Sequence, residues 1–192
     1  MYLFFDTETT GLPKNWRSPI TDLNNWPRIV QIAWQIYDDN HEKILERNYI
    51  IKPEGFVIPE QAARIHGITT ERAIKEGTEL KEALGEFADA LTLNQYLIAH
   101  NISFDEKVTG AEFLRIGLPL DLFAMPKICT MFSSINHCNI PGQFGSPKWP
   151  TLMELHTTLF NKGFDDAHDA MVDVSACADC FFELKKIGVI EI

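Results

Sequence analysis

Three segments near the start of the chain show the alternation of apolar and polar residues that is typical of β-strands. The first covers Tyr2 to Glu8, the second about Ile29 to Tyr37, and the third about Ile44 to Ile51. Four apolar residues at a spacing of two define one face of the second segment: Val30, Ile32, Trp34 and Ile36. A turn at residues 38–40 follows the second segment, so we expect the three strands to form an antiparallel meander.

Helical spacing of apolar residues begins near residue 59. Short helices are expected over residues 59–65 and 70–76, and Thr78 is placed to cap a longer one. This longer helix has an apolar stripe at spacings of four, three and four, formed by Leu80, Leu84, Phe87 and Leu91. Such a stripe predicts that the helix packs against the sheet.

Short strands then alternate with helices. Apolar strands are predicted over residues 96–99 and 127–131. Between them, Ser103 and Glu106 have the spacing of a capping box, which indicates a helix that ends near Gly117. Residues 136–150 are rich in Gly and Pro and are expected to form a loop, and a second capping box follows at Thr151 and Glu154.

The chain closes with a helix over about residues 169–187 that ends at Gly188. Its apolar stripe consists of Ala170, Val174, Cys177, Phe181 and Leu184. Three antiparallel strands followed by alternating helices and strands predict an α/β fold with a mixed central sheet. A length of 192 residues suits one domain, residues 1–192, with a core large enough to fold unaided.

Two acidic residues interrupt the first apolar strand. Asp6 and Glu8 are two residues apart, so both carboxylates lie on one face, while Phe5 and Thr7 face the other side. Carboxylates held this close repel each other, and a divalent cation relieves that repulsion. Oxygen ligands of this kind select magnesium or manganese. Taken alone, the pair also fits a solvated strand end.

Three further polar residues stand at the ends of predicted elements. Asp105 lies in the first turn of a helix, where a carboxylate also complements the helix dipole. His168 and Asp173 are five residues apart, so they share a site only if His168 lies before the helix that carries Asp173. An imidazole there is able to act as a general base. Together, four carboxylates and one histidine are the inventory for phosphoryl chemistry with two metal ions.

The segments around these residues resemble a known family. FDTETTGL at residues 5–12, HNISFD at 100–105 and AHDAMVD at 167–173 resemble, in this order, the three motifs of the DEDDh 3′–5′ exonucleases. This family includes the epsilon subunit of bacterial DNA polymerase III and has an RNase H-like fold. The segment IHGIT at 65–69 also resembles epsilon-like members.

The resemblance implies a role for each residue of the cluster. Asp6 is expected to bridge two divalent cations, Mg²⁺ or Mn²⁺. Glu8 and Asp173 are expected to hold the cation that binds the attacking water, and Asp105 the second cation. His168 is the expected general base. The tyrosine branch of the family has Tyr one residue later, where this chain has Asp169.

The resemblance also implies contacts to the terminal nucleotide. The residues expected to bind it are Thr9, Thr10, Leu12, His66 and Phe104. Leu12 is expected to act as a wedge beside the base. The connection over residues 13–27 is longer than the compact turn common in the family.

The net charge of −10, from 17 Lys and Arg against 27 Asp and Glu, argues at first against a polyanionic partner. The charges are unevenly distributed, however. Residues 122–153 contain no Asp or Glu, and residues 13–28 carry Lys14, Arg17 and Arg28 against Asp22. Four aromatic residues lie in these two stretches: Trp16, Trp26, Phe144 and Trp149. Basic and aromatic residues together favour a single nucleic-acid strand, while Trp26 and Trp149 fit equally well as covers for the sheet edge.

Location and partners follow from what the sequence lacks. The start of the chain has no basic leader, and no apolar stretch is long enough to span a membrane, so we expect a cytoplasmic protein without membrane contact. Four cysteines are too few for a disulfide scaffold, and Cys177 and Cys180 fit a packed helix. A stable polymerase partner is not expected, because no C-terminal tether follows the last helix.

These observations predict a metal-dependent 3′–5′ exonuclease that acts on single-stranded DNA or frayed 3′ ends and releases nucleoside 5′-monophosphates. An RNA-trimming enzyme of the same fold is the alternative within enzymes. A non-catalytic nucleic-acid-binding module is disfavoured because all five residues of the cluster are present. An acidic scaffold protein is a further alternative, and an assay with an end-labelled oligonucleotide separates these hypotheses.

Overall fold

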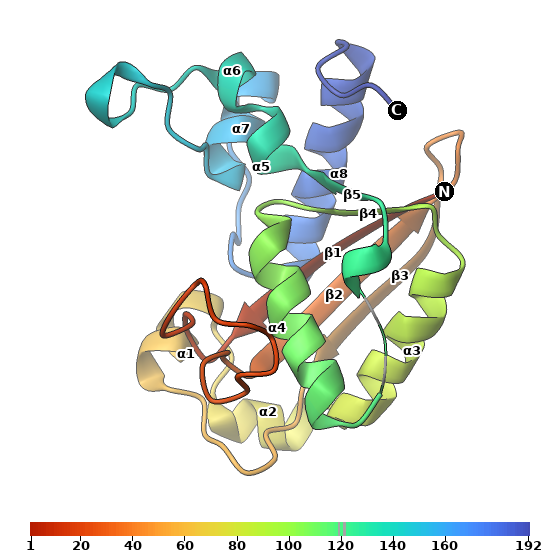
Figure 1. Ribbon diagram of the computed structural model, residues 1–192, viewed down its shortest axis with the longest axis vertical. Helices are drawn as coiled ribbons and strands as arrows, with labels where there is room; N and C mark the ends of the chain where they lie inside the picture. The colour runs from red at the N-terminus through yellow and green to blue at the C-terminus, as the bar shows by residue number, and fades with distance from the viewer. Residues whose placement is uncertain (119, 121) are drawn as a thin grey trace.

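The centre of the molecule is a mixed sheet of five strands in the order β3-β2-β1-β4-β5. The computed structural model (Figure 1) describes residues 1–118, 120 and 122–192, and the side chain of Phe144 also lies outside the described part. The strands are β1 (Tyr2–Thr9), β2 (Ile29–Tyr37), β3 (Lys43–Ile50), β4 (Tyr96–Ala99) and β5 (Lys127–Cys129). Strands β1, β2 and β3 pair antiparallel, and β4 runs parallel to β1 and β5. The predicted α/β class and antiparallel meander are confirmed.

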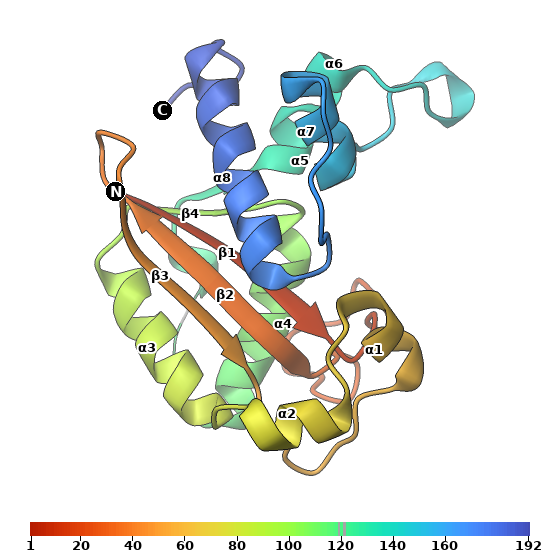
Figure 2. The same cartoon turned by 180° about the vertical axis from the view of Figure 1, so that it is seen from behind.

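Helices cover both faces of this sheet. They are α1 (Glu60–His66), α2 (Thr70–Glu76), α3 (Leu80–Thr92), α4 (Ile102–Arg115), α5 (Thr130–Ser133), α6 (Ile135–Cys138), α7 (Leu152–Phe160) and α8 (Ala170–Lys186), with 3₁₀ turns η1 (Leu122–Ala124) and η2 (Gln143–Gly145). The two opposite views place α3 and α4 on one face and α8 on the other (Figures 1 and 2). Helices α1 and α2 lie beside the end of the sheet where β1 finishes (Figure 2).

Strand β1 divides the core into two layers by the period-two rule. Leu3 and Phe5 pack with α3 and α4, and the ring centroids of Phe5 and Phe87 are 5.3 Å apart. Phe4 faces the other way and packs against Phe181 of α8 at 5.3 Å. All members of the two apolar stripes predicted for α3 and α8 are buried. The even-numbered side chains of β1 therefore face α8, and the odd-numbered ones face α3 and α4.

One residue departs from the predicted face of β2. Ile32, Trp34 and Ile36 share the layer of α3 and α4, but Val30 packs with α1 and α2 beside Ala62. The pairing register shifts here, because Glu8 faces Gln31 whereas Thr9 faces Ile29. An irregularity of this kind leaves one residue unpaired and turns it out of the alternation.

The predicted helix caps were partly wrong. Thr151 and Glu154 form the predicted capping box at the start of α7. In contrast, Thr78 does not cap α3, because its backbone N–H donates to Ile50 O in a bridge to the sheet. Ser103 lies inside α4, which begins after Asn101 in a left-handed conformation (φ 67°).

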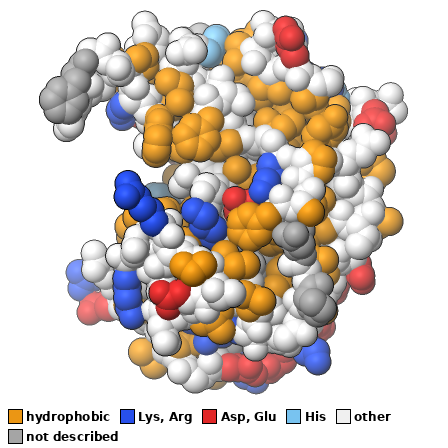
Figure 3. Space-filling model, viewed as in Figure 1, with side chains coloured by type: hydrophobic (Ala, Val, Ile, Leu, Met, Phe, Trp, Pro, Cys, Tyr) orange, Lys and Arg blue, Asp and Glu red, His pale blue; other side chains and the backbone are white. Residues whose placement is uncertain are grey.

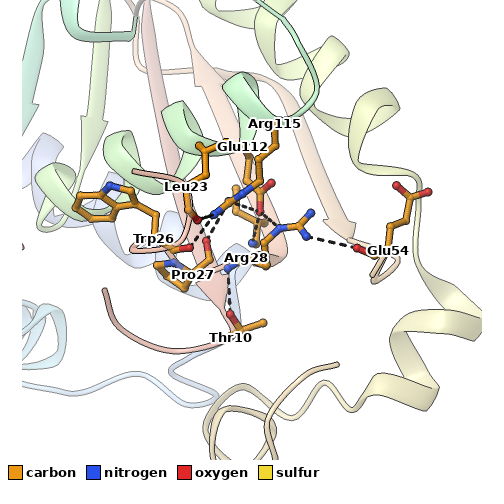
Figure 4. A network of polar contacts seen from close by, with 9 residues as sticks. Thr10, Leu23, Trp26, Pro27, Arg28, Glu54, Glu112 and Arg115 are labelled. Carbon is orange, nitrogen blue, oxygen red and sulfur yellow. Dashed lines mark hydrogen bonds and ion pairs between the residues drawn. The ribbon is translucent and has the colours of Figure 1, made fainter. Parts of the chain in front are cut away.

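The long connection between β1 and β2 is held by a buried ion-pair network (Figure 4). Glu112 of α4 accepts from Arg28 Nε at 2.8 Å and from the Ile29 backbone N–H at 3.0 Å, and it pairs with Arg115 at 3.2 Å. The Arg115 guanidinium also donates to the backbone carbonyls of Leu23 and Trp26. These contacts hold the connection between β1 and β2 against α4.

The same connection contains two tryptophans in different settings. Trp26 is 3% exposed and donates through Nε1 to Pro19 O, so its side chain is part of the hydrophobic core. Trp16 is 47% exposed, with its ring centroid 5.7 Å from that of Phe104. Trp26 was expected either to contact a nucleic-acid strand or to cover the edge of the sheet, and its burial agrees with the second hypothesis.

Two further findings concern the chain as a whole. Cys177 and Cys180 are buried in α8, as a packed helix requires. In the described ranges, none of the helices combines the length and apolar character needed to cross a bilayer.

Candidate active site

Asp6 and Glu8 project from β1 toward the start of α8. Both side chains are partly buried, and they lie on the same side as Phe4, which packs against α8. Thr7 lies between them and faces the opposite side of the sheet. The strand therefore presents two carboxylates to one cavity, as its period of two predicts.

Asp105 reaches the same place from α4. Its Oδ1 accepts hydrogen bonds from the Thr7 hydroxyl at 2.7 Å and from the Thr7 backbone N–H at 3.1 Å. Asp105 is 3% exposed, so these two bonds fix a buried carboxylate in one orientation. Thr7 thus positions Asp105 beside the strand that carries Asp6 and Glu8.

His168 and Asp173 come from the start of α8. Helix α8 begins at Ala170, so His168 precedes it, as sharing a site with Asp173 requires. The backbone of His168 is left-handed (φ 72°), and its N–H donates to Asp173 Oδ2 at 3.1 Å. This conformation is uncommon for non-glycine residues, although histidine adopts it more often than most.

These residues converge on one cavity of about 500 Å³, lined by Asp6, Glu8, Asp105, His168 and Asp173 together with Phe104, His100, Trp149 and neighbouring residues. One ligand atom each from Glu8, His168 and Asp173 lie within 4.8 Å of one another. Segments separated by about 100 and 160 residues in the chain are thereby brought together.

The electrostatics of the cavity disfavour ionised carboxylates. Burial raises the pKa of Glu8 to about 8, with further contributions from the charges of Asp173 and Asp105. Burial also raises the pKa of Asp6 well above its ordinary value, and repulsion from Asp105 and Asp173 acts in the same direction. The pKa of Asp105 is raised to about 7, chiefly by burial, although the hydrogen bonds from Thr7 oppose the shift. The pKa of Asp173 is raised by burial as well.

The donor set fits divalent cations. Among the described residues, no lysine or arginine forms an ion pair with Asp6, Glu8, Asp105 or Asp173. Crowded carboxylates without a cationic partner are the ligands that hard divalent ions bind in proteins. The cavity thus contains a carboxylate group able to bind metal.

Removing one of these charges has a predictable effect on stability in EDTA. The pKa of Asp105 is about 7 in the folded protein against an ordinary 3.8. Below pH 4 the group is protonated in both states, and between pH 4 and 7 only the unfolded form ionises, so the folded state loses stability as pH rises. We expect Asp105→Asn to be more stable than wild type by roughly 1–3 kcal/mol at pH 8 and by little at pH 4.

Thermal unfolding of both proteins in EDTA at several pH values measures this difference. Asparagine retains an oxygen that can accept from Thr7, so the comparison isolates the charge. A Tm difference that is constant from pH 4 to pH 8 would contradict the prediction.

A second cavity of about 480 Å³ adjoins the first. All five residues expected to contact a terminal nucleotide line it: Thr9, Thr10, Leu12, His66 and Phe104. Phe104 lines both cavities, and Leu12 is 73% exposed at the rim. The backbone N–H of Arg28 donates to the Thr10 hydroxyl at 3.0 Å, so the buried network around Glu112 also fixes this wall (Figure 4).

Three residues around the site were not predicted. Gln31 of β2 is buried, accepts from the Ala170 N–H and donates to Asp169, so it fixes the start of α8. Asp169 caps that helix and adds negative charge near Glu8. The ring of His100, whose pKa burial lowers to about 4, contacts the Thr130 hydroxyl and Pro150 O at 3.0 Å each. Gln31 had a signal in the sequence, since it is a polar residue within a strand otherwise suited to burial.

The fold and this cavity define a class of protein, the DEDD-type exonucleases of RNase H-like fold. The chain belongs to the RNase_T exonuclease family, whose model matches residues 3–181. This confirms the family resemblance seen in the three motifs and, at the level of the family, the predicted 3′–5′ exonuclease class of enzyme. Comparison with curated proteins finds no significant match.

Solved structures of exonuclease I share the fold. The structure of E. coli exonuclease I in complex with a dT13 oligonucleotide is 23% identical, with a TM-score of 0.74 over 96% of this chain and 40% of that one. The zinc-ion-bound form of the E. coli exonuclease I complex with single-stranded DNA is 22% identical, with a TM-score of 0.77 over 97% of this chain and 41% of that one. The chain thus spans about two fifths of these proteins, and the likeness confirms the predicted RNase H-like fold.

Proposed function

We propose that the protein is a metal-dependent 3′–5′ exonuclease that removes nucleoside 5′-monophosphates from single-stranded DNA or frayed 3′ ends. The observation that carries this proposal is the convergence of four carboxylates and His168 on one cavity, next to a second cavity lined by Thr9, Leu12 and His66. Membership of the RNase_T exonuclease family supports the same activity.

The carboxylates Asp6, Glu8, Asp105 and Asp173 would hold two divalent cations, Mg²⁺ or Mn²⁺. When bound, such cations neutralise the phosphodiester, favour ionisation of the attacking water and stabilise the leaving oxygen. Thr7 keeps Asp105 in one orientation, and the backbone N–H of His168 does the same for Asp173. Two of the four carboxylates, Asp105 and Asp173, are therefore oriented by hydrogen bonds before any cation binds.

His168 acts as the general base. Its ring accepts a proton from the attacking water, whose oxygen forms a bond to the terminal phosphorus while the bond from phosphorus to the 3′ oxygen breaks. The products are a nucleoside 5′-monophosphate and a strand that is one nucleotide shorter, with a 3′ hydroxyl after protonation of the leaving oxygen. A ring nitrogen of His168 lies within 4.8 Å of ligand atoms of Glu8 and Asp173, which suits this role.

The second cavity receives the terminal nucleotide. Thr9, Thr10 and His66 offer polar groups to the sugar and the base, and Phe104 and Leu12 offer apolar contact. The two cavities share Thr7, Glu8 and Phe104 as lining residues. A nucleotide seated there would place its 5′ phosphate near the carboxylates.

The experiment that tests this function is trimming of 5′-labelled DNA and RNA oligonucleotides of one sequence with Mg²⁺, Mn²⁺ or EDTA. We expect a ladder that shortens from the 3′ end, faster on DNA, and no product in EDTA. Faster trimming of RNA would favour the alternative enzyme, because the 2′-hydroxyl is the group that distinguishes the two strands. Absence of product from pH 6 to pH 9 with either metal would refute the enzyme and leave a binding module or a scaffold.

A further inference from the structure

Two walls of opposite character flank the acidic cavity on its open side. Figure 3 shows a hollow with hydrophobic side chains on its upper rim and Lys or Arg side chains on its lower rim. The upper rim lies over α5 and the arm, which we define as residues 139–150, and the lower rim lies over α4 and the connection 13–28 (Figure 1). Each wall contains an exposed tryptophan.

The upper wall is an aromatic pair at the base of the arm. Trp149 is 60% exposed and lines the acidic cavity, and its ring meets that of Phe132 edge-on at 5.1 Å. Phe132 is itself 44% exposed. Large aromatic side chains exposed this far beside a polar site are the kind of platform on which bases stack.

The position of Trp149 is fixed from both sides. The next residue, Pro150, accepts a hydrogen bond from His100 Nε2 at 3.0 Å. The residue before it, Lys148, pairs with Glu154 at 2.6 Å, and its N–H closes the arm by donating to Ile140 O. The indole is therefore held in place without being covered.

The lower wall supplies positive charge. Lys14, Arg17 and Lys107 form no ion pair within the described residues, although the protein has a net charge of −10. Lys107 Nζ lies 3.4 Å from Trp16 O, which joins α4 to the connection at this point. The Trp16 ring packs against Phe104, a residue that lines both cavities. Three cationic side chains without a carboxylate partner among the described residues thus lie on the two segments next to the site of the proposed chemistry.

We propose that these two walls form a track for the single strand on the 5′ side of the scissile phosphate. Trp149 and Phe132 stack on the bases, and Lys14, Arg17 and Lys107 contact the phosphates. The inference rests on the proposed function, and it adds that the protein prefers strands long enough to reach beyond the two cavities. The acid-free stretch 122–153 fits this role, because a carboxylate there would repel the strand.

Binding of 5′-fluorescein dT12 to the full chain in EDTA, measured by anisotropy from 25 to 200 mM salt, tests the track without hydrolysis. The triple variant Lys14→Gln, Arg17→Gln, Lys107→Gln should bind more weakly and lower the slope of log affinity against log salt by about 2, since each contact to a single strand contributes about 0.7. The control variant Lys75→Gln, Lys81→Gln, Lys162→Gln changes the net charge equally, away from the track. Equal slopes in the two variants would overturn the proposal.

Variants of Trp149 test the aromatic wall separately from the cationic one. Trp149→Ala should weaken dT12 binding by about 5- to 100-fold, and Trp149→Phe should restore most of the affinity because it keeps a stacking face. In trimming assays, the ratio of kcat/KM for dT12 to that for dT2 should fall in Trp149→Ala. If Trp149→Ala changes neither this ratio nor the binding of dT12, the track is overturned. If wild type trims no oligonucleotide at all, the proposed function is refuted, and the binding measurements alone decide whether the track exists.

Discussion

Replacing His168 by alanine should lower the rate of 3′ trimming by about 10²- to 10⁴-fold, the range that a positioned general base contributes. The four carboxylates remain in this variant, so cation and strand binding should change little. The Asp173 carboxylate keeps its contact with the backbone N–H of residue 168, because that bond does not involve the imidazole. Single-turnover trimming of a labelled dT12 with Mg²⁺ measures the loss of rate.

Rescue by an added base separates chemistry from structure in this variant. If His168 takes the proton, small imidazole-like bases in the buffer should restore part of the trimming rate of His168→Ala. His100→Gln is the matched control, since His100 lines the same cavity but is occupied by Thr130 and Pro150. Near-normal turnover in His168→Ala would exclude it as the base.

Asp6→Asn should reduce trimming by about 10³-fold or more, because Asp6 would help to hold the cations and several kcal/mol of transition-state stabilisation would depend on them. The loss of one charge should also change the response to metal. Millimolar Mn²⁺ should raise the Tm of wild type, since a ligand that binds only the folded state stabilises it. The rise should be much smaller in Asp6→Asn.

Asp169→Asn is the control for this second prediction. The charge of Asp169 acts on Asp6, but its side chain caps α8 by accepting from the N–H groups of Met171 and Val172. Asparagine caps a helix about as well as aspartate, so stability should be preserved. Trimming within a few fold of wild type is expected for this control. Equal losses in the two variants would show that charge alone, and not a ligand at Asp6, sets the rate.

The sequence predicted the elements of the fold well where periodicity decides them. Strand β2 and helix α2 have the predicted boundaries, and the apolar stripes of α3 and α8 are buried as expected. Predictions failed where a long-range contact decided the outcome. The bridge between Ile51 and Thr78 removes Thr78 from its predicted cap, and the register shift opposite Thr9 turns Val30 away from its predicted face.

The five residues that line the acidic cavity were named from the sequence, and their roles stay predictions, whereas the residues that support them were not predicted. Period two placed Asp6 and Glu8 together, and the family motifs indicated Asp105, His168 and Asp173. No local pattern shows that Thr7 binds Asp105, because the two are 98 residues apart in the chain. The same holds for Gln31, whose bonds to the start of α8 span 138 and 139 residues. Contacts of this kind depend on the sheet order and become visible only in three dimensions.

The buried network around Glu112 holds the connection 13–28 in place in the absence of any ligand. Because Arg28 and Arg115 bind the connection 13–28 to α4 at many points, that segment cannot swing open as a lid without exposing an unpaired buried charge. The conformational entropy of ordering it is lost during folding and not during binding. If the proposed function holds, a single strand would meet a preformed binding surface, and diffusion and charge would govern its association instead of a closing motion.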